Sequence, residues 1–330
     1  MTALATVAQK LDRVRSPMVG GVLGRSAALR GVAADRRARL ALGAVAALVA
    51  ALAVSLAAPM AWFLWGPLAL GIPHVLADAR YLVLSPYRRI ALRRRDVVLA
   101  GGLVTLAVAG TPWLGAIVVI GAVVLTPAAD ARRRAAVLAA AIALAYTAWS
   151  SPVITSYVMM HVHNLVALVV LAGLAGRRRV GWGLAGGALA IAAAVLSGRL
   201  DAALPMHALD ELAAYVLPDA ALAQWTTAAC ARVALTFVFL QGVHYAVWLR
   251  LIPAAMRPHG GMRGFGASVR ALERDCTAPI IAIVAAAALA LPALAVVGAS
   301  DAATLRELYV QLAGGHAYLE LAVLARWLTS

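Results

Sequence analysis

Five histidines lie inside long apolar stretches of this sequence: His74, His161, His163, His244 and His316. Ionisable side chains are rare in such stretches, because a polar group without a partner costs several kcal/mol in hydrocarbon. We therefore expect each imidazole to face other protein groups. Neutral imidazole is a metal ligand and a proton carrier, so these residues are the first candidates for chemistry.

Four of these histidines lie at nearly the same distance from one end of their stretch. His74 stands 14 residues before Arg88, His163 14 before Arg177, His244 13 before Arg257, and His316 14 before Ser330. At a helical rise of ~1.5 Å per residue, this spacing corresponds to a depth of ~20 Å. The sequence therefore predicts that four helices present imidazole in one plane.

Two of the four histidines are followed by a carboxylate at helical spacing. Asp78 stands four residues after His74, and Glu320 stands four residues after His316, so each pair shares one helix face. A carboxylate in that place can bind a metal ion directly, or it can accept the imidazole N–H and orient the ring. We predict one of these two roles for both carboxylates.

The remaining candidates lie beside the histidines. His161 and His163 are two residues apart, roughly 200° around a regular helix, so both can bind one ion only if the helix is distorted. We expect one of them to be a ligand and the other a structural partner. Asn164 can hydrogen-bond water, a ligand or a backbone carbonyl, and Tyr245 can donate a proton or a hydrogen bond. Asn164 and Tyr245 are the two candidate catalytic residues.

Imidazole and carboxylate without thiolate form a ligand set typical of non-haem Fe(II), and less specifically of manganese, zinc or copper. The two cysteines, Cys230 and Cys276, are far apart and lack the spacing of a thiolate site. A ferrous centre with three or four histidines has open positions for dioxygen and a substrate. Because the centre would lie within lipid, we expect an apolar small-molecule substrate that enters from the bilayer. The predicted function is a membrane oxygenase.

Transmembrane helices are the elements that must position these residues. The chain of 330 residues is 64% hydrophobic and 13% charged, with a mean hydropathy of +0.88, which lies outside the range of soluble domains. Apolar stretches of ~20 residues, long enough to cross a bilayer, recur along it. The sequence predicts an all-α, polytopic transmembrane bundle of about ten helices over 39–330, preceded by a cytoplasmic, interfacial amphipathic segment over 1–38. The expected spans are 40–58, 61–85, 97–110, 113–128, 134–150, 153–176, 180–197, 223–253, 277–298 and 305–328.

Arginines lie in short clusters between the apolar stretches, in every second connection, as from Arg132 to Arg134. The alternate connections are nearly free of arginine. By the positive-inside rule, the basic connections and both termini are cytoplasmic. Topology thus explains the net charge of +15, and nucleic acid is not an expected partner, because its binding needs a continuous basic face. We expect a multi-pass protein of a bacterial-type inner membrane, in contact with membrane lipid.

A short motif surrounds the first of the intramembrane histidines. The residues Gly71-Ile72-Pro73-His74 followed by Asp78 resemble the G-x-P-H-x-x-x-D signature of the Brp/Blh family, the bacterial membrane β-carotene dioxygenases. The resemblance implies an all-helical membrane protein whose histidines hold Fe(II) and whose activity is the oxidative cleavage of carotenoids to retinal. It also implies that His74 is an iron ligand and that Asp78 is its supporting carboxylate.

Two other functions are compatible with the sequence. Two histidines on facing helices at one depth can be axial ligands of haem, as in an electron-transfer cytochrome. Intramembrane histidines and carboxylates can also relay protons or metal ions in a transporter. A conducting path is expected to spread polar groups along its length, whereas here they concentrate near one depth. We therefore predict a binding site rather than a conduction path for protons or metal ions.

Overall fold

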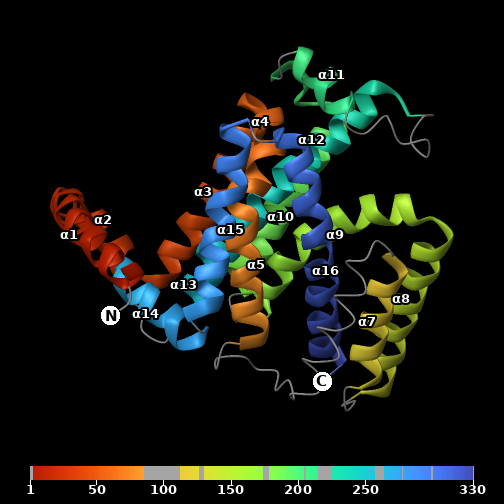
Figure 1. The fold of residues 1–330 in the computed structure, drawn as a ribbon, viewed down its shortest axis with the longest axis horizontal. Helices are drawn as coiled ribbons and strands as arrows, with labels where there is room; N and C mark the ends of the chain where they lie inside the picture. The colour runs from red at the N-terminus through yellow and green to blue at the C-terminus, as the bar shows by residue number, and fades with distance from the viewer. Residues whose placement is uncertain are drawn as a thin grey trace.

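A computed structural model describes residues 3–84, 112–125, 130–173, 178–203, 206–214, 225–256, 264–276, 278–298 and 300–329. Every regular element within these ranges is a helix (Figure 1). The all-α fold class predicted from the sequence is thus confirmed for the described part of the chain.

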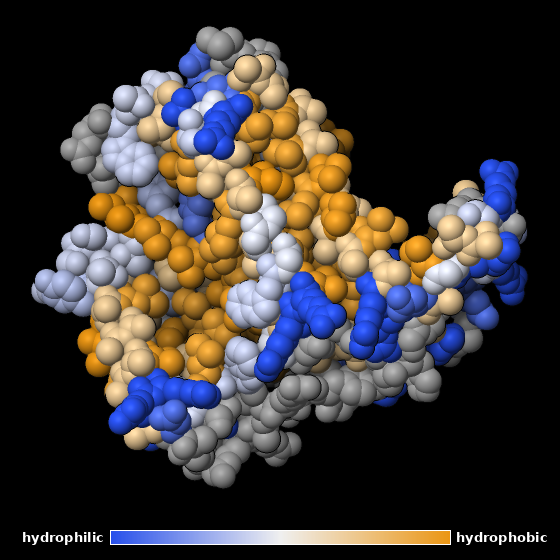
Figure 2. All heavy atoms as spheres, turned by 180° about the vertical axis from the view of Figure 1, so that it is seen from behind, coloured by the Kyte–Doolittle hydropathy of each residue, from blue (hydrophilic) through white to orange (hydrophobic). Residues whose placement is uncertain are grey.

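Several of the helices suit a bilayer. Among the described residues, five stretches are long and apolar enough to cross one, and two shorter apolar helices accompany them at Leu114–Val124 and Ile281–Val296. Figure 2 shows a broad apolar surface with hydrophilic side chains at its margins. These features are compatible with a membrane protein. The five stretches are Arg36–Ala57, Pro59–Leu82, Pro152–Ala172, Arg178–Leu196 and Thr227–Ala255.

The N-terminal part forms an arm of two helices at one side of the bundle (Figure 1), α1 (Ala3–Gly24) and α2 (Ala27–Ala34). The α1 helix packs against α14 (Phe265–Asp275), where the backbone N–H groups of Phe265 and Gly266 donate to the carboxylate of Asp12. An apolar stripe on α1 is exposed, as expected of an interfacial helix. The stripe consists of Val7, Leu11, Val14 and Met18.

Two of the expected spans are helices that contain turns of π-helix. The first is the run of α4 (Pro59–Gly66), η1 (Pro67–Gly71), α5 (Ile72–Asp78) and η2 (Ala79–Leu84). The second is the run of α12 (Thr227–Ala246), η5 (Val247–Leu251) and α13 (Ile252–Ala255). Such turns are rare and are frequent at functional sites. Here they lie close to His74 and His244.

The other described helices pack around these two runs. Nine of the ten expected spans coincide with helices of the structure to within a few residues, and the span expected over 97–110 falls outside the described residues. The remaining elements are α3 (Arg36–Ala57), α7 (Pro112–Val124), α8 (Ala131–Ser150), α9 (Pro152–Ala172), α10 (Arg178–Leu196), η3 (Asp201–Ala203), α11 (Met206–Ala214), α15 (Ala278–Val296) and α16 (Ala302–Thr329).

The α12 helix lies at the centre of the fold. Its side chains from Ala234 to Tyr245 are all buried, and it packs against α3, α9 and α10. Close approach to α3 depends on Gly242, since a Cβ there would lie 3.0 Å from Cβ of Ala51. Small residues commonly allow such contacts between membrane helices. The packing fixes the position of His244 in the interior.

Candidate metal centre

Four histidines from four helices meet in the interior of the bundle. His74 lies on α5, His163 on α9, His244 on α12 and His316 on α16. One ring nitrogen from each lies within 4.8 Å of those of the other three. The convergence that the sequence predicted from matched depths is therefore present, and the group has the composition of a metal site.

Hydrogen bonds between the rings cannot account for all the close contacts among three histidine nitrogens. Nε2 of His316 is 3.1 Å from Nε2 of His74 and also 3.1 Å from Nε2 of His163. An imidazole nitrogen has one in-plane position, which holds either a proton or a lone pair. His316 Nε2 can therefore make only one of these two contacts as a hydrogen bond. A cation between the three nitrogens would satisfy them all.

The opposite nitrogens of two of these rings each lie beside an oxygen atom. His316 Nδ1 lies against the carbonyl oxygen of Ala313, to which its N–H donates. His163 Nδ1 lies 2.7 Å from Oε2 of Glu320, at ion-pair distance but without the geometry of a hydrogen bond. Metal-binding histidines are commonly held in this way, because the outer partner fixes the tautomer and the ring orientation.

The separations also agree with the geometry of coordination. Two ligand atoms bound at ~2.1 Å lie ~3.0 Å apart when they subtend a right angle and ~3.4 Å apart at the tetrahedral angle. The observed distances of 3.1 Å between nitrogens are closer to the right angle. Three imidazoles that held one ion would leave positions for other ligands.

His244 and two carboxylates lie beside the three nitrogens. His244 is fully buried, and neither of its ring nitrogens has a hydrogen-bond partner among the described residues. It also forms a group with Asp78 and Glu320, whose ligand atoms lie within 4.8 Å of one another, and Oδ2 of Asp78 is 3.8 Å from Nε2 of His316. Both carboxylates are only 1% exposed. Buried carboxylates need a compensating charge, which a divalent cation would supply.

His161 lies apart from this group. Its Nδ1 is 2.9 Å from the carbonyl oxygen of Tyr157, its Nε2 is 3.3 Å from that of Val233, and its ring packs on Phe237. The sequence left open which of His161 and His163 is the ligand. The structure brings His163 to the group and gives His161 contacts with backbone carbonyls instead.

A cavity of about 310 Å³ adjoins the four histidines. Tyr245 and Asn164, the two candidate catalytic residues, line it. The Tyr245 hydroxyl accepts a hydrogen bond from Nε2 of Gln241 at 2.9 Å, and its ring centroid is 4.8 Å from that of His74. Asn164 is buried, and its Nδ2 has no hydrogen-bond partner among the described residues. Much of the remaining wall is apolar, with Met159, Met160, Phe237, Val310, Ala317 and Tyr318.

Tyr309 is a cavity residue that the sequence analysis missed. It lies on α16 seven residues before His316, on the same helix face, which is the signal that could have found it. Its ring packs on Gly71, where a Cβ would come within 2.3 Å of Tyr309 Cζ. The glycine of the G-x-P-H motif therefore makes room for an aromatic wall of the cavity.

No protein-family model, curated protein or solved structure matches the chain. The likeness of residues 71–78 to the β-carotene dioxygenases stays an expectation from that motif. The geometry of the histidine group is the main evidence on function.

Proposed function

We propose that this chain is an integral membrane metalloenzyme, a non-haem iron oxygenase that uses dioxygen to oxidise a lipid-soluble, isoprenoid-type substrate. The observation that carries the proposal is the meeting of three imidazole nitrogens at the wall of a largely apolar cavity, with a fourth histidine and two buried carboxylates beside them. A metal ion and an apolar molecule would thus lie side by side.

The ligand chemistry supports iron as the metal. The group is made of imidazole and carboxylate, and no cysteine belongs to it within the described residues. Such a set suits Fe(II), and also manganese, zinc or copper. We propose Fe(II), because histidines accompanied by carboxylates, with positions open for other ligands, are the ligand set of non-haem iron oxygenases. Ferrous ion in that position would supply the activation of dioxygen.

The protein groups around the ion have separate roles in this proposal. His74, His163 and His316 would hold the ion, and Glu320, whose Oε2 lies 2.7 Å from Nδ1 of His163, would keep that ring in the tautomer that binds. Tyr245 accepts a hydrogen bond from Gln241, and its own O–H would donate to an oxygen in the cavity. Asn164 Nδ2 orients the substrate or water, and the apolar wall excludes bulk water.

We also propose ten membrane spans, both termini in the cytoplasm and an inner-membrane location of bacterial type. The alternation of arginine-rich and arginine-poor connections supports this topology. Membrane lipid surrounds the bundle in this arrangement, and the substrate enters the cavity from the bilayer.

Dioxygen uptake tests the proposal. The purified chain in detergent is loaded anaerobically with Fe(II) and mixed with air-saturated buffer and either β-carotene or an extract of membrane isoprenoids. We expect uptake that His316→Ala abolishes and that His161→Ala preserves, with oxygenated product found by mass spectrometry. A Soret band in the purified protein would favour a cytochrome. Proton or metal flux in liposomes that His74→Ala abolishes would favour a transporter. Either result, or no uptake above His316→Ala, would contradict the oxygenase.

A further inference from the structure

Asp78, His244 and Glu320 form a second group of potential metal ligands beside the three histidine nitrogens. One ligand atom of each lies within 4.8 Å of those of the other two, and all three residues are buried. The contacts of 3.1 Å between ring nitrogens, which define the first group, do not include His244. The second group therefore needs an explanation of its own.

The two carboxylates of the second group come from the helices that supply two histidines of the first. Asp78 follows His74 by four residues on α5, and Glu320 follows His316 by four residues on α16. Four residues of helix rise ~6 Å, and α5 and α16 pack against each other. Each helix thus supplies a histidine at one level and a carboxylate one turn further along.

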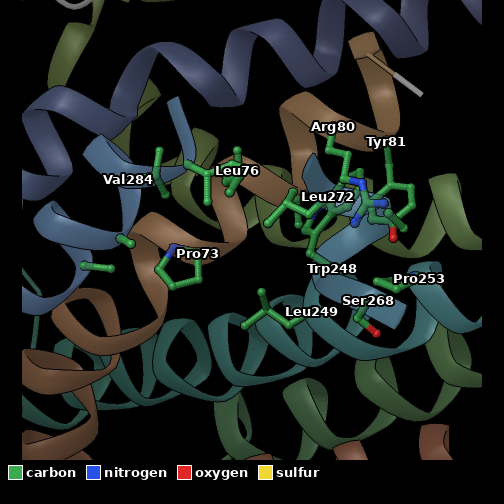
Figure 3. A pocket seen from close by; sticks show the side chains of 15 residues that line it. Pro73, Leu76, Arg80, Tyr81, Trp248, Leu249, Pro253, Ser268, Leu272 and Val284 are labelled. Atoms are coloured by element: carbon green, nitrogen blue, oxygen red, sulfur yellow. The ribbon is translucent and has the colours of Figure 1, made fainter. Parts of the chain in front are cut away.

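The two carboxylates do not line either of the cavities beside them. Asp78 and Glu320 are each 1% exposed, and neither is in the wall of the cavity next to the histidines. Neither is in the wall of a second cavity, of about 400 Å³, where Figure 3 shows Leu76, Arg80 and Trp248. Two negative charges that are close together and without hydration repel strongly in a protein interior.

No lysine or arginine of the described residues lies at ion-pair distance from either carboxylate. Arg80, two residues after Asp78, is already paired with another carboxylate. The neighbours at ion-pair distance are ligands of the first group, His163 at 2.7 Å from Glu320 and His316 at 3.8 Å from Asp78. Because imidazole binds a metal ion in its neutral form, these rings supply no positive charge when they hold the first ion.

His244 is the residue that points to a second metal ion. It is fully buried, and neither of its ring nitrogens makes a hydrogen bond of normal geometry within the described residues. A neutral imidazole has one N–H and one lone pair, and burial of either without a partner costs free energy. If His244 joined the first ion, both carboxylates would still lack a ligand or donor. A cation in the second group satisfies the lone pair and both carboxylates together.

We propose that Asp78, His244 and Glu320 bind a second divalent cation, of the Mn(II) or Fe(II) class, next to the iron of the proposed function. Carboxylate and imidazole are ligands that suit these ions, and one divalent cation balances the two negative charges. The inference rests on the metal site of the proposed function but not on the oxidation. The second ion binds more weakly than the first, because it enters beside an ion of like charge.

Titration with Mn(II), an air-stable probe for both positions, tests the proposal. The purified full chain in detergent is stripped with a chelator, freed of the chelator and equilibrated with Mn(II), and the electron spin resonance of free Mn(II) gives the amount bound. We expect about two equivalents per chain at saturation, of which desalting removes about one. The two bound ions should give a spin-coupled signal, since Oδ2 of Asp78 lies only 3.8 Å from Nε2 of His316.

Two substitutions should remove the second position alone. Asp78→Asn keeps the size of the side chain, and His244→Ala removes the unpartnered ring. Each should bind about one equivalent, with the signal of an isolated ion. Glu307→Gln, at an exposed carboxylate of α16, and His161→Ala, at a histidine outside both groups, are the matched controls and should bind about two. Melting temperatures check that the variants fold, and the result for the native chain needs no variant.

The outcomes separate this inference from the proposed function. About one equivalent in the native chain would overturn the second site and keep the iron site, with His244 as a fourth ligand or a proton shared by Asp78 and Glu320. Undiminished binding in both Asp78→Asn and His244→Ala would also overturn it. No binding by the native chain would overturn both the inference and the metal site on which it rests.

Discussion

The Nδ1 atom of His163 lies 2.7 Å from Oε2 of Glu320, so a carboxylate on α16 lies at ion-pair distance from the ring of a histidine on α9. This contact joins two helices and leaves Nε2 of His163 directed at Nε2 of His316, 3.1 Å away. The pair links the packing of α9 against α16 to the geometry of the proposed metal centre.

Replacing that carboxylate should weaken metal binding without removing a histidine. We expect Glu320→Gln to lower metal affinity by about 10- to 100-fold, because the amide fixes the His163 tautomer poorly. Competition with a chelator of known affinity measures the change. Glu307→Gln, at an exposed carboxylate of the same helix, is the control and should retain native affinity. Unchanged affinity in Glu320→Gln would show that this carboxylate does not support the ligand.

The two neighbouring histidines of α9 should behave differently. His163→Ala removes a nitrogen that lies 3.1 Å from His316 Nε2 and should abolish tight metal binding. His161→Ala removes contacts with the carbonyl oxygens of Tyr157 and Val233, and should lower thermal stability while keeping the metal. Metal content and melting temperature of the two purified variants make the comparison. Loss of metal in His161→Ala at normal stability would reverse the assignment.

The glycine of the G-x-P-H motif should tolerate no side chain. A Cβ on Gly71 would come within 2.3 Å of Tyr309 Cζ, so Gly71→Ala is expected to cost ~1–3 kcal/mol through overpacking. The displaced tyrosine should also alter the cavity and slow dioxygen uptake. Thermal unfolding measures the first effect. Gly183→Ala on α10 is the matched control, since a Cβ there meets no atom within 4 Å. Equal stability of the two variants would rule out the close packing.

The contact between α1 and α14 should depend on pH. Backbone N–H groups of Gly266 and Phe265 donate to Asp12 and hold the pKa of its carboxyl below the ordinary value of 3.8. A carboxyl with a lowered pKa in the folded state stabilises the contact above its ordinary pKa, and the stabilisation is lost as the pH falls through the lowered value. We therefore expect α1 to stay docked at neutral pH and to be released only under acid conditions.

Hydrogen exchange at the start of α14 measures this release. Asp12→Asn should speed exchange of the Phe265 and Gly266 amides at pH 7, where the native contact is intact. Asp35→Asn, which removes the negative charge at the start of α3 and keeps a side-chain oxygen there, should leave those amides unchanged. If Asp12→Asn exchanges as slowly as the native chain, the carboxylate does not anchor the arm.

The sequence predicted that histidines of four helices meet at one depth, with His161 or His163 as the fourth, because the positions of the spans set depth. His74, His163, His244 and His316 stand at matched distances from the ends of their stretches, and helices of similar length bring matched positions to one level. The all-helical fold was predicted from the hydrophobic composition and the recurring apolar stretches. The count of ten spans and the cytoplasmic termini stay predictions, since length and apolarity support five crossing helices among the described residues.

The sequence did not predict how each helix is rotated about its own axis. His161 and His163 lie at nearly the same depth, so depth does not show which one is the ligand. The packing of α9 against α12 and α16 directs His161 toward the carbonyl of Val233 and His163 toward His316. The π-helical turns at Pro67–Gly71 and Ala79–Leu84 shift the register around His74, and local propensity did not predict them. Tyr309 was missed for the same reason, because its role depends on contact with Gly71 from a distant helix.

Elemental analysis of the purified full chain, reconstituted anaerobically with Fe(II), tests the central claim most directly. We expect about one equivalent of tightly bound iron per chain, retained in His161→Ala and lost when His74 and His316 are both replaced by alanine. Less than one equivalent of any transition metal in the native chain, or equal metal in the double variant, would contradict it.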